Sequence, residues 1–309
     1  MNLKDAVSLQ HLFLLIKIEK GSDPMFSPVV AKFGGTSLAE GNQFQKVQSI
    51  VSSGKNRSCI VVSAPGKRFE GDQKVTDLLG EIHRLKESGE CHDGLLSLIR
   101  KRYEEICSRL KLSTDFCKEI QSVCREINAS SHRDFILSRG EYLNALIMAK
   151  SLGYTLVDAK DVVFFQENGE LDERKTHEAI GKRLKRQEKV IVPGFYGSDS
   201  RGGVKTFARG GSDISGALIA KGIGAGLYEN WTDVSGVMTA DPRIEQSART
   251  IPSLTYKELL RVSRGGAQVY HPDAIPPVEC VRIPIQIRNT NKPEDSGTII
   301  KGDEENGED

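Results

Sequence analysis

The stretch from Val29 to Ser37, with the sequence VVAKFGGTS, constrains the fold of this chain more than any other. Its apolar residues are typical of a buried strand, and its glycine pair, Gly34 and Gly35, lets backbone N–H groups approach a ligand closely. Thr36 or Ser37 is then predicted to cap a following helix. The stretch therefore predicts a strand, a tight turn and a helix start.

This turn also has the features of an anion site. Backbone N–H groups at a helix N-terminus favour phosphate, and Lys32 adds a full positive charge beside them. The alternative is an ordinary turn between a strand and a helix, with Lys32 facing water.

A second glycine pair opens a helix between Phe207 and Ala217 and carries charges of both signs. Arg209 is suited to bind a carboxylate or a phosphate through two hydrogen bonds. Asp213 would repel a phosphate unless a cation neutralises it, so it predicts a nearby cation, for which Lys32 is the candidate. The alternative is that Ser212 and Asp213 are simply N-cap residues.

Composition limits the partners. The chain has 309 residues with 43 basic and 42 acidic side chains, a formal net charge of +1, so its bulk charge indicates neither a nucleic acid nor an acidic membrane. Six cysteines form no C-x-x-C pair, which favours reduced thiols in a cytoplasmic protein. The six histidines form no close ligand pair, so we expect no zinc site and no metal held by protein ligands alone.

The two ends differ from the rest. Residues 1–27 contain an apolar run too short to cross a bilayer and no convincing signal-peptide cleavage site, so we treat them as an extension outside the site. Residues 302–309 are acidic and poor in apolar residues and are expected to be disordered. One folded domain is expected to span residues 28–301.

Further candidate residues follow strands or open helices. The apolar run from Cys59 ends at Ser63, at the carboxyl end of a predicted strand, where open α/β sheets bind ligands. The polar loop after it, to about Gln73, is able to move over a site. Thr76 then either faces a ligand or caps the helix predicted over 75–85.

Two more segments leave alternatives open. In the predicted helical region 93–149, Gly140 interrupts the pattern, so that Glu141 would open the next helix, where an acid is favourable without any ligand. After the predicted strand 226–231, the polar segment to Arg243 is suited to hold ribose and phosphates, or it is a plain polar loop.

Four motifs, in the same order, resemble those of the aspartate kinase family over about residues 28–301. They are KFGGTS at 32–37, RGGSD at 209–213, WTDVSGV at 231–237 followed by Asp241-Pro242-Arg243, and GAQVYHP at 266–272. The resemblance implies the amino-acid kinase fold, a three-layer αβα sandwich around a mainly parallel sheet. The N-terminal half would hold the amino acid and the C-terminal half the nucleotide.

The resemblance also implies the reaction. Such an enzyme would transfer a phosphoryl group from ATP, with Mg²⁺ carried by the phosphates, to the β-carboxylate of L-aspartate. The product, 4-phospho-L-aspartate, is the first intermediate toward lysine, threonine and methionine.

Matching positions carry the family's roles over to this chain. Lys32 and Asp213 would be the catalytic pair, with Asp213 orienting Lys32. Five positions match the aspartate site, where Glu141 would meet the ammonium and Arg209 a carboxylate: Ser63, Thr76, Glu141, Arg209 and Ser212. Seven match the nucleotide site: Lys32, Gly34, Gly35, Thr232, Asp233, Arg243 and Gln268.

The chain departs from the family pattern in three ways. Gln268 stands where some members have a lysine that reaches the nucleotide, and Met238 replaces a common tyrosine. The regulatory ACT domains that usually follow are expected to be absent, so neither feedback control nor the oligomer they assemble carries over; a homodimer is compatible with the remainder.

Two other functions stay open. One is a kinase for another acidic metabolite on the same fold, such as glutamate or acetylglutamate. The other is a non-catalytic nucleotide-binding subunit, which Gln268 would favour and which the intact Lys32 and Asp213 argue against.

Overall fold

The computed structural model describes residues 27–54, 56–184, 189–240, 245, 247–265 and 269–302. Most of the predicted extension and tail lies outside these residues. In the described part, the main sheet has eight strands in the order β3-β4-β2-β1-β7-β9-β10-β8, and β5 and β6 form a separate hairpin. The strands are β1 (Val29–Phe33), β2 (Arg57–Val62), β3 (Thr155–Leu156), β4 (Val190–Pro193), β5 (Tyr196–Ser198), β6 (Val204–Thr206), β7 (Leu227–Thr232), β8 (Ser253–Thr255), β9 (Ile285–Asn289) and β10 (Thr298–Lys301).

The sheet is mainly parallel. All its neighbouring strands run parallel except β9 and β10, which pair antiparallel. The helices are α2 (Gly41–Ser53), α3 (Val75–Glu87), α4 (Asp93–Arg109), α5 (Thr114–Ala129), α6 (Arg133–Leu152), α7 (Glu173–Arg183), α8 (Gly211–Ile223), α9 (Tyr256–Arg264) and α10 (Pro276–Glu279), with short 3-10 turns η1 (Thr36–Leu38), η2 (Ala159–Asp161) and η3 (Pro272–Ala274).

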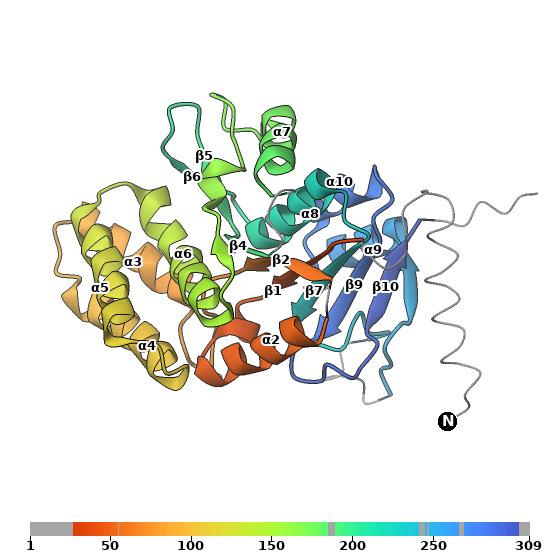
Figure 1. Ribbon diagram of the computed structural model, residues 1–309, viewed down its shortest axis with the longest axis horizontal. Helices are drawn as coiled ribbons and strands as arrows, with labels where there is room; N and C mark the ends of the chain where they lie inside the picture. The colour runs from red at the N-terminus through yellow and green to blue at the C-terminus, as the bar shows by residue number, and fades with distance from the viewer. Residues whose placement is uncertain are drawn as a thin grey trace, which may run out of the picture.

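Helices cover both faces of the sheet, as the alternation of side chains along a strand requires. In β1, Val30 joins a core with α7, α8, α9 and α10, whereas Ala31 and Phe33 join a second core with α2 to α6. Figure 1 shows α8 and α10 above the sheet, α2 below it, and α3 to α6 grouped at one end. The predicted three-layer α/β architecture is confirmed.

The expected break at Gly140 is wrong, because α6 runs without interruption from Arg133 to Leu152. A Cβ at position 140 would lie 2.7 Å from the Cβ of Ala64 and 3.4 Å from Cδ1 of Leu79. The glycine therefore lets α6 pack closely against the segment after β2, and Glu141 lies inside a helix instead of opening one.

The expected cap after the first strand is also wrong. One 3-10 turn, η1, follows β1, and α2 begins only at Gly41 with Glu40 as its N-cap and no side-chain cap bond. Ser37 is buried and its Oγ lies 2.7 Å from Oγ1 of Thr290, after β9, so it joins two loops instead of capping a helix.

The order of the strands determines where ligands can bind. From β1 the chain continues to β2 and then β4 on one side, and β7 and β9 lie on the other side. In such open sheets the crevice at the carboxyl ends of the strands, where the strand order reverses, is the usual ligand site. Lys32 lies near the carboxyl end of β1, at this point.

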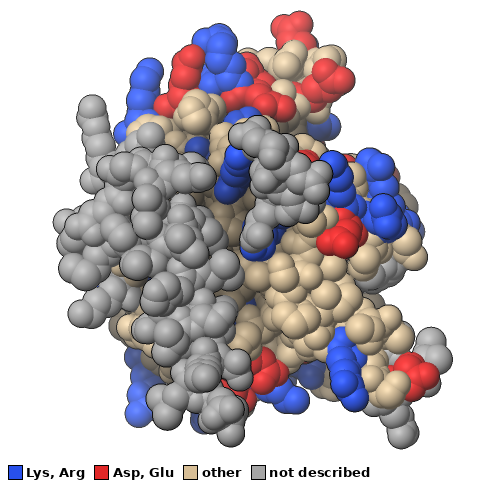
Figure 2. Space-filling view, turned by 90° about the vertical axis from the view of Figure 1, so that its right-hand side faces the viewer, with Lys and Arg blue, Asp and Glu red and all other residues tan. Residues whose placement is uncertain are grey.

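The charged side chains are mixed on the visible surface. Figure 2 shows the end of the molecule that carries α9 and β10, where basic and acidic side chains are interspersed around an uncharged area. None of the described helices is long and apolar enough to cross a membrane.

Candidate active site

Lys32, Asp213 and Asn230 form a polar cluster on the α8 face of the sheet. Lys32 on β1 is directly opposite Asn230 on β7, and Asp213 lies in the first turn of α8. The Nζ of Lys32 is 2.5 Å from Oδ1 of Asp213 and 3.3 Å from Oδ1 of Asn230. The ion pair that the sequence predicts between the two motifs is present.

Asp213 is held by more than Lys32. Its Oδ1 lies 3.4 Å from Nδ2 of Asn230, and its Oδ2 accepts from the backbone N–H of His271 at 3.3 Å. The hydroxyl of Tyr228 donates to its backbone carbonyl at 3.1 Å. With only 9% of the Lys32 side chain and 15% of the Asp213 side chain exposed, the pair is fixed in one geometry and weakly screened by water.

The first glycine pair follows Lys32 directly. A Cβ at Gly34 would lie 3.7 Å from the Nζ of Lys32, an ordinary van der Waals contact, so Gly34 borders the amine but is not required by it. Gly35 is required for a different contact. A Cβ at this position would lie 2.9 Å from the carbonyl oxygen of Ala64 and 3.1 Å from Gly66, which is too close. Gly35 therefore brings the β1 and β2 loops together.

The second glycine pair shapes the start of α8. Gly210 is the N-cap and has a φ of 60°, which favours glycine, and a Cβ at Gly211 would lie 2.8 Å from the Cα of Phe195. Because Gly210 is the N-cap, Ser212 and Asp213 are helical residues, and the alternative that they are N-caps is wrong. The first N–H groups of an α-helix have no carbonyl partner within the helix. The start of α8 is therefore suited to bind an anion.

Arg209 and Ser212 lie at this end of α8. Arg209 is exposed and Ser212 is partly buried, next to Gly194 at the end of β4. A cavity of about 650 Å³ opens nearby, since Ala208 and Phe195 line it together with residues of α6 and β6. There is thus space for a small ligand beside the segment that carries Arg209.

Ser63 and Thr76 flank the loop after β2. Thr76 is the second residue of α3, whose N-cap is Lys74, so Thr76 is not the cap and its predicted contact with a ligand stays open. Ser63 follows β2 directly, and its carbonyl accepts from Nδ2 of Asn144 at 2.7 Å.

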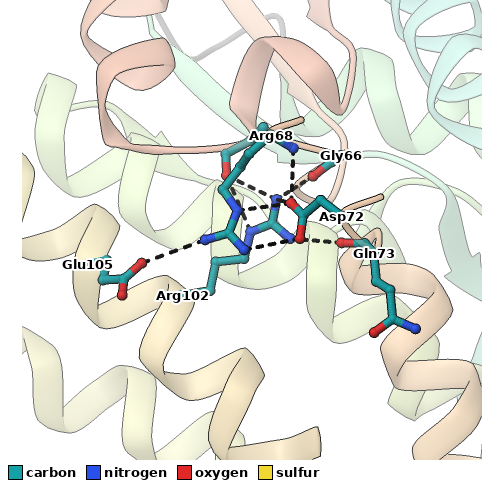
Figure 3. A network of polar contacts seen from close by, with 7 residues as sticks. Gly66, Arg68, Asp72, Gln73, Arg102 and Glu105 are labelled. Atoms are coloured by element: carbon teal, nitrogen blue, oxygen red, sulfur yellow. Dashed lines mark hydrogen bonds and ion pairs between the residues drawn. The ribbon is translucent and has the colours of Figure 1, made fainter. Parts of the chain in front are cut away.

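A buried arginine ties the loop between Ser63 and Thr76 to α4. Arg102 is 5% exposed and donates to the carbonyls of Gly66 and Gln73, and its Nη2 is 3.4 Å from Oδ2 of Asp72 (Figure 3). Arg68 binds the same carboxylate through Nε at 2.9 Å, and the two arginines hold the pKa of Asp72 well below its usual value. The loop that we expected to be able to move over the site is therefore anchored in this structure.

Glu141 is a buried acid with an incomplete set of partners. It is 4% exposed, and its Oε2 has no hydrogen-bond partner among the described residues. Burial raises its pKa to about 8, although a hydrogen bond from the backbone N–H of Ala64 acts in the opposite direction. Such a carboxylate would be stabilised by a cationic ligand.

Thr232 and Asp233 lie at the carboxyl end of β7, on the other side of β1. Thr232 ends the strand, and its hydroxyl donates to Oδ1 of the exposed Asp233 at 3.1 Å. Both thus lie at the carboxyl edge of the sheet, where a nucleotide contact was expected. Arg243 and Gln268 lie outside the described residues.

Three residues of this region were missed from the sequence. Asn230 and Asn144 contact site residues, but a single amide within a strand or helix carries no signal by itself. Phe195 has a φ of 75°, which is strained for a residue with a side chain. The residue types around it do not predict this backbone conformation.

The chain was compared with known proteins. The model of the amino acid kinase family matches residues 27–289. The chain belongs to this family. Aspartokinase 3 of Bacillus subtilis is 36% identical over 294 residues, an alignment that covers 90% of this amino acid kinase and 65% of the relative.

Solved structures of aspartate kinases are similar to this chain. Aspartate kinase of Clostridium acetobutylicum superposes with a TM-score of 0.85 at 46% identity, covering 91% of this chain and 64% of that chain. Escherichia coli aspartokinase III in complex with aspartate and ADP gives a TM-score of 0.78 at 28% identity, with 90% and 65% covered. The chain thus spans about two thirds of the length of these relatives.

Proposed function

We propose that this amino acid kinase transfers the γ-phosphoryl group of ATP to the β-carboxylate of L-aspartate. The observation that carries the proposal is the buried Lys32–Asp213 ion pair at the point where the strand order reverses. The proteins that it resembles over most of its length are aspartokinases, one of them solved with aspartate and ADP, which supports the choice of substrates.

The reaction brings two anions together, so charge cancellation is the main task of the site. The β-carboxylate of aspartate is ionised at neutral pH, and no general base is required. Lys32 would contact the transferring phosphoryl group, and Asp213 and Asn230 would hold its amine in place. The N–H groups at the start of α8 and the Gly34 turn would add partial positive charge.

The proposed amino-acid site uses the residues around Glu141. Glu141 would bind the ammonium group, because its Oε2 is orphaned and a cation would stabilise the carboxylate that burial disfavours. Arg209 and Ser212 would bind a carboxylate, and Ser63 and Thr76 would complete the site. Thr232 and Asp233 would contact the nucleotide on the other side of β1, with Arg243 and Gln268 as further predicted contacts.

Magnesium would enter with ATP. Among the described residues no group of three His, Cys, Asp or Glu side chains is placed to hold a metal, and the Asp213 carboxylate is already paired with Lys32. Phosphate oxygens and water are the ligands that Mg²⁺ usually keeps, so the nucleotide itself would carry the ion. A cytoplasmic location and a homodimer stay predictions.

A coupled assay of ADP release tests the proposal. Aspartate, glutamate and acetylglutamate are compared at equal concentration with MgATP. We expect ADP release with aspartate and the least with acetylglutamate, whose nitrogen is acylated and offers Glu141 no cation. Release with glutamate alone would assign a different acceptor, and nucleotide binding without any release would favour a non-catalytic subunit.

A further inference from the structure

Two buried side chains of α6 each have an oxygen atom without a hydrogen-bond partner among the described residues. Glu141 and Asn144 are three residues apart and so lie on one face of the helix. They are 4% and 0% exposed, and Oε2 of Glu141 and Oδ1 of Asn144 both lack a hydrogen-bond partner among the described residues. Two orphaned acceptors so close along one helix are unusual, because nearly all buried polar atoms in native proteins are paired.

The two side chains reach the same place. The backbone N–H of Ala64 donates to the Glu141 carboxylate, and Nδ2 of Asn144 donates to the carbonyl of Ser63 at 2.7 Å. That carbonyl and that N–H belong to one peptide group, so Glu141 and Asn144 hold its two sides. Their remaining oxygens are therefore at the carboxyl end of β2, beside Ser63.

The chemistry of the missing partner follows from these atoms. When Glu141 is ionised both orphaned atoms are acceptors, and one belongs to a carboxylate, so the partner that completes the site donates hydrogen bonds and is best positively charged. A primary ammonium group has three N–H donors and carries a positive charge, so it is the ligand group that suits these acceptors best. A divalent metal would need more oxygen or nitrogen ligands than these two provide.

We propose that Oδ1 of Asn144 accepts a hydrogen bond from the α-ammonium group of the substrate, beside Glu141, so that Asn144 helps select a free amino acid. This inference rests on the proposed function, because it assigns one more contact to the same amino-acid site. The competing explanation is that Asn144 does not contact the substrate and only stabilises the fold, through its hydrogen bond to the Ser63 carbonyl.

Aspartate and succinate separate the two explanations. Succinate has both carboxylates of aspartate and no ammonium, so its affinity reports on every part of the site except the ammonium contact. Dissociation constants of both ligands are measured by calorimetry for the wild type, Asn144→Ala and the control Asn128→Ala. Asn128 is exposed at the end of α5, where its amide contacts His92.

A hydrogen bond to a charged group is worth enough to weaken aspartate binding about tenfold when it is lost. We expect Asn144→Ala to bind aspartate about tenfold more weakly and succinate within about twofold of the wild type, and Asn128→Ala to leave both unchanged. Equal weakening of the two ligands, or no weakening of aspartate, would overturn the inference.

Asn144→Asp separates the acceptor oxygen of Asn144 from its donor group. It keeps an acceptor oxygen but loses the Nδ2 donor to the Ser63 carbonyl, and thermal unfolding reports whether each variant folds. We expect Asn144→Asp to prefer aspartate over succinate at least as strongly as the wild type does, whereas loss of that preference would contradict the ammonium contact. If the wild type uses glutamate instead, the proposed substrate fails, and the same comparison with glutamate and glutarate decides on Asn144.

Discussion

The Lys32–Asp213 pair is largely buried and the Glu141–Asn144 pair fully buried, but only in the first does the charged group already have a partner. Lys32 already has its counterion at 2.5 Å, whereas Glu141 Oε2 and Asn144 Oδ1 have no partner among the described residues. A paired charge needs no ligand to be stable, whereas burial keeps Glu141 mostly protonated at pH 7 until a cation pairs with its carboxylate. Under the proposed function the first region would be preorganised for the reacting phosphoryl group, and the amino acid would complete the second.

The largest effect is expected at the complete pair. Lys32→Ala removes a positive charge about 4 Å from the transferring group, worth roughly 4 kcal/mol at an effective dielectric constant near 20, or about three decades in rate. We expect kcat to fall about a thousandfold in steady-state ADP release. Lys46→Ala, at an exposed position of α2, serves as the control. A kcat within a few-fold of the wild type would remove Lys32 from the mechanism.

For a substitution at Glu141 we expect a large change in aspartate binding and a small change in kcat. Glu141→Gln keeps the shape but removes the charge that the substrate ammonium would meet, and a buried charged contact is worth about 2 kcal/mol or more, or at least thirtyfold. KM for aspartate should rise by about that factor with KM for ATP unchanged. The exposed Glu126→Gln is the control. A rise in both KM values would show that Glu141 only supports the fold.

A smaller effect is expected from Asp213→Asn, which tests how Lys32 is held. The amide keeps the shape of the carboxylate but not its charge, so the Lys32 amine would lose its fixed position, and misplaced groups cost rate. We expect kcat to fall on the order of tenfold while KM for aspartate is unchanged. A fall as deep as that of Lys32→Ala would mean that Asp213 itself contacts the reacting groups.

The smallest effect is the pH dependence that the orphaned carboxyl group imposes. With a pKa of about 8, Glu141 is mostly protonated at pH 7, and it must ionise to pair with an ammonium group. KM for aspartate should therefore fall about fivefold from pH 7 to pH 8 and then level off, and this trend should be absent in Glu141→Gln. A KM that does not change with pH would contradict an ammonium contact at Glu141.

The same pKa predicts the stability of the protein without ligand. Folding raises the pKa of Glu141, so the folded state holds the proton more tightly than the unfolded state. This group's contribution to the free energy of unfolding consequently falls as the pH rises from the ordinary range of a glutamate to about 8. Thermal unfolding at pH 8 should show Glu141→Gln more stable than the wild type.

Local patterns predicted much of the fold correctly. The strand predicted over 226–231 matches β7, and the helix predicted over 75–85 matches α3, because the patterns that predict them lie within the elements themselves. Gly140 was misread for the opposite reason. Its absence of a side chain serves a contact with Ala64, 76 positions earlier in the chain, and no local pattern records that contact.

The sequence by itself determined that two glycine-paired turns carry Lys32, Arg209 and Asp213, since a carboxylate beside an anion site needs a cation wherever the chain places it. Only the tertiary structure decided which groups support that pair and which are left incomplete. Asn230 meets Lys32 through the register of β1 and β7, and Glu141 becomes an orphaned buried acid because α6 packs against the end of β2. The physical reason is that desolvation and hydrogen-bond satisfaction depend on all the atoms around a group, and most of those atoms come from distant parts of the chain.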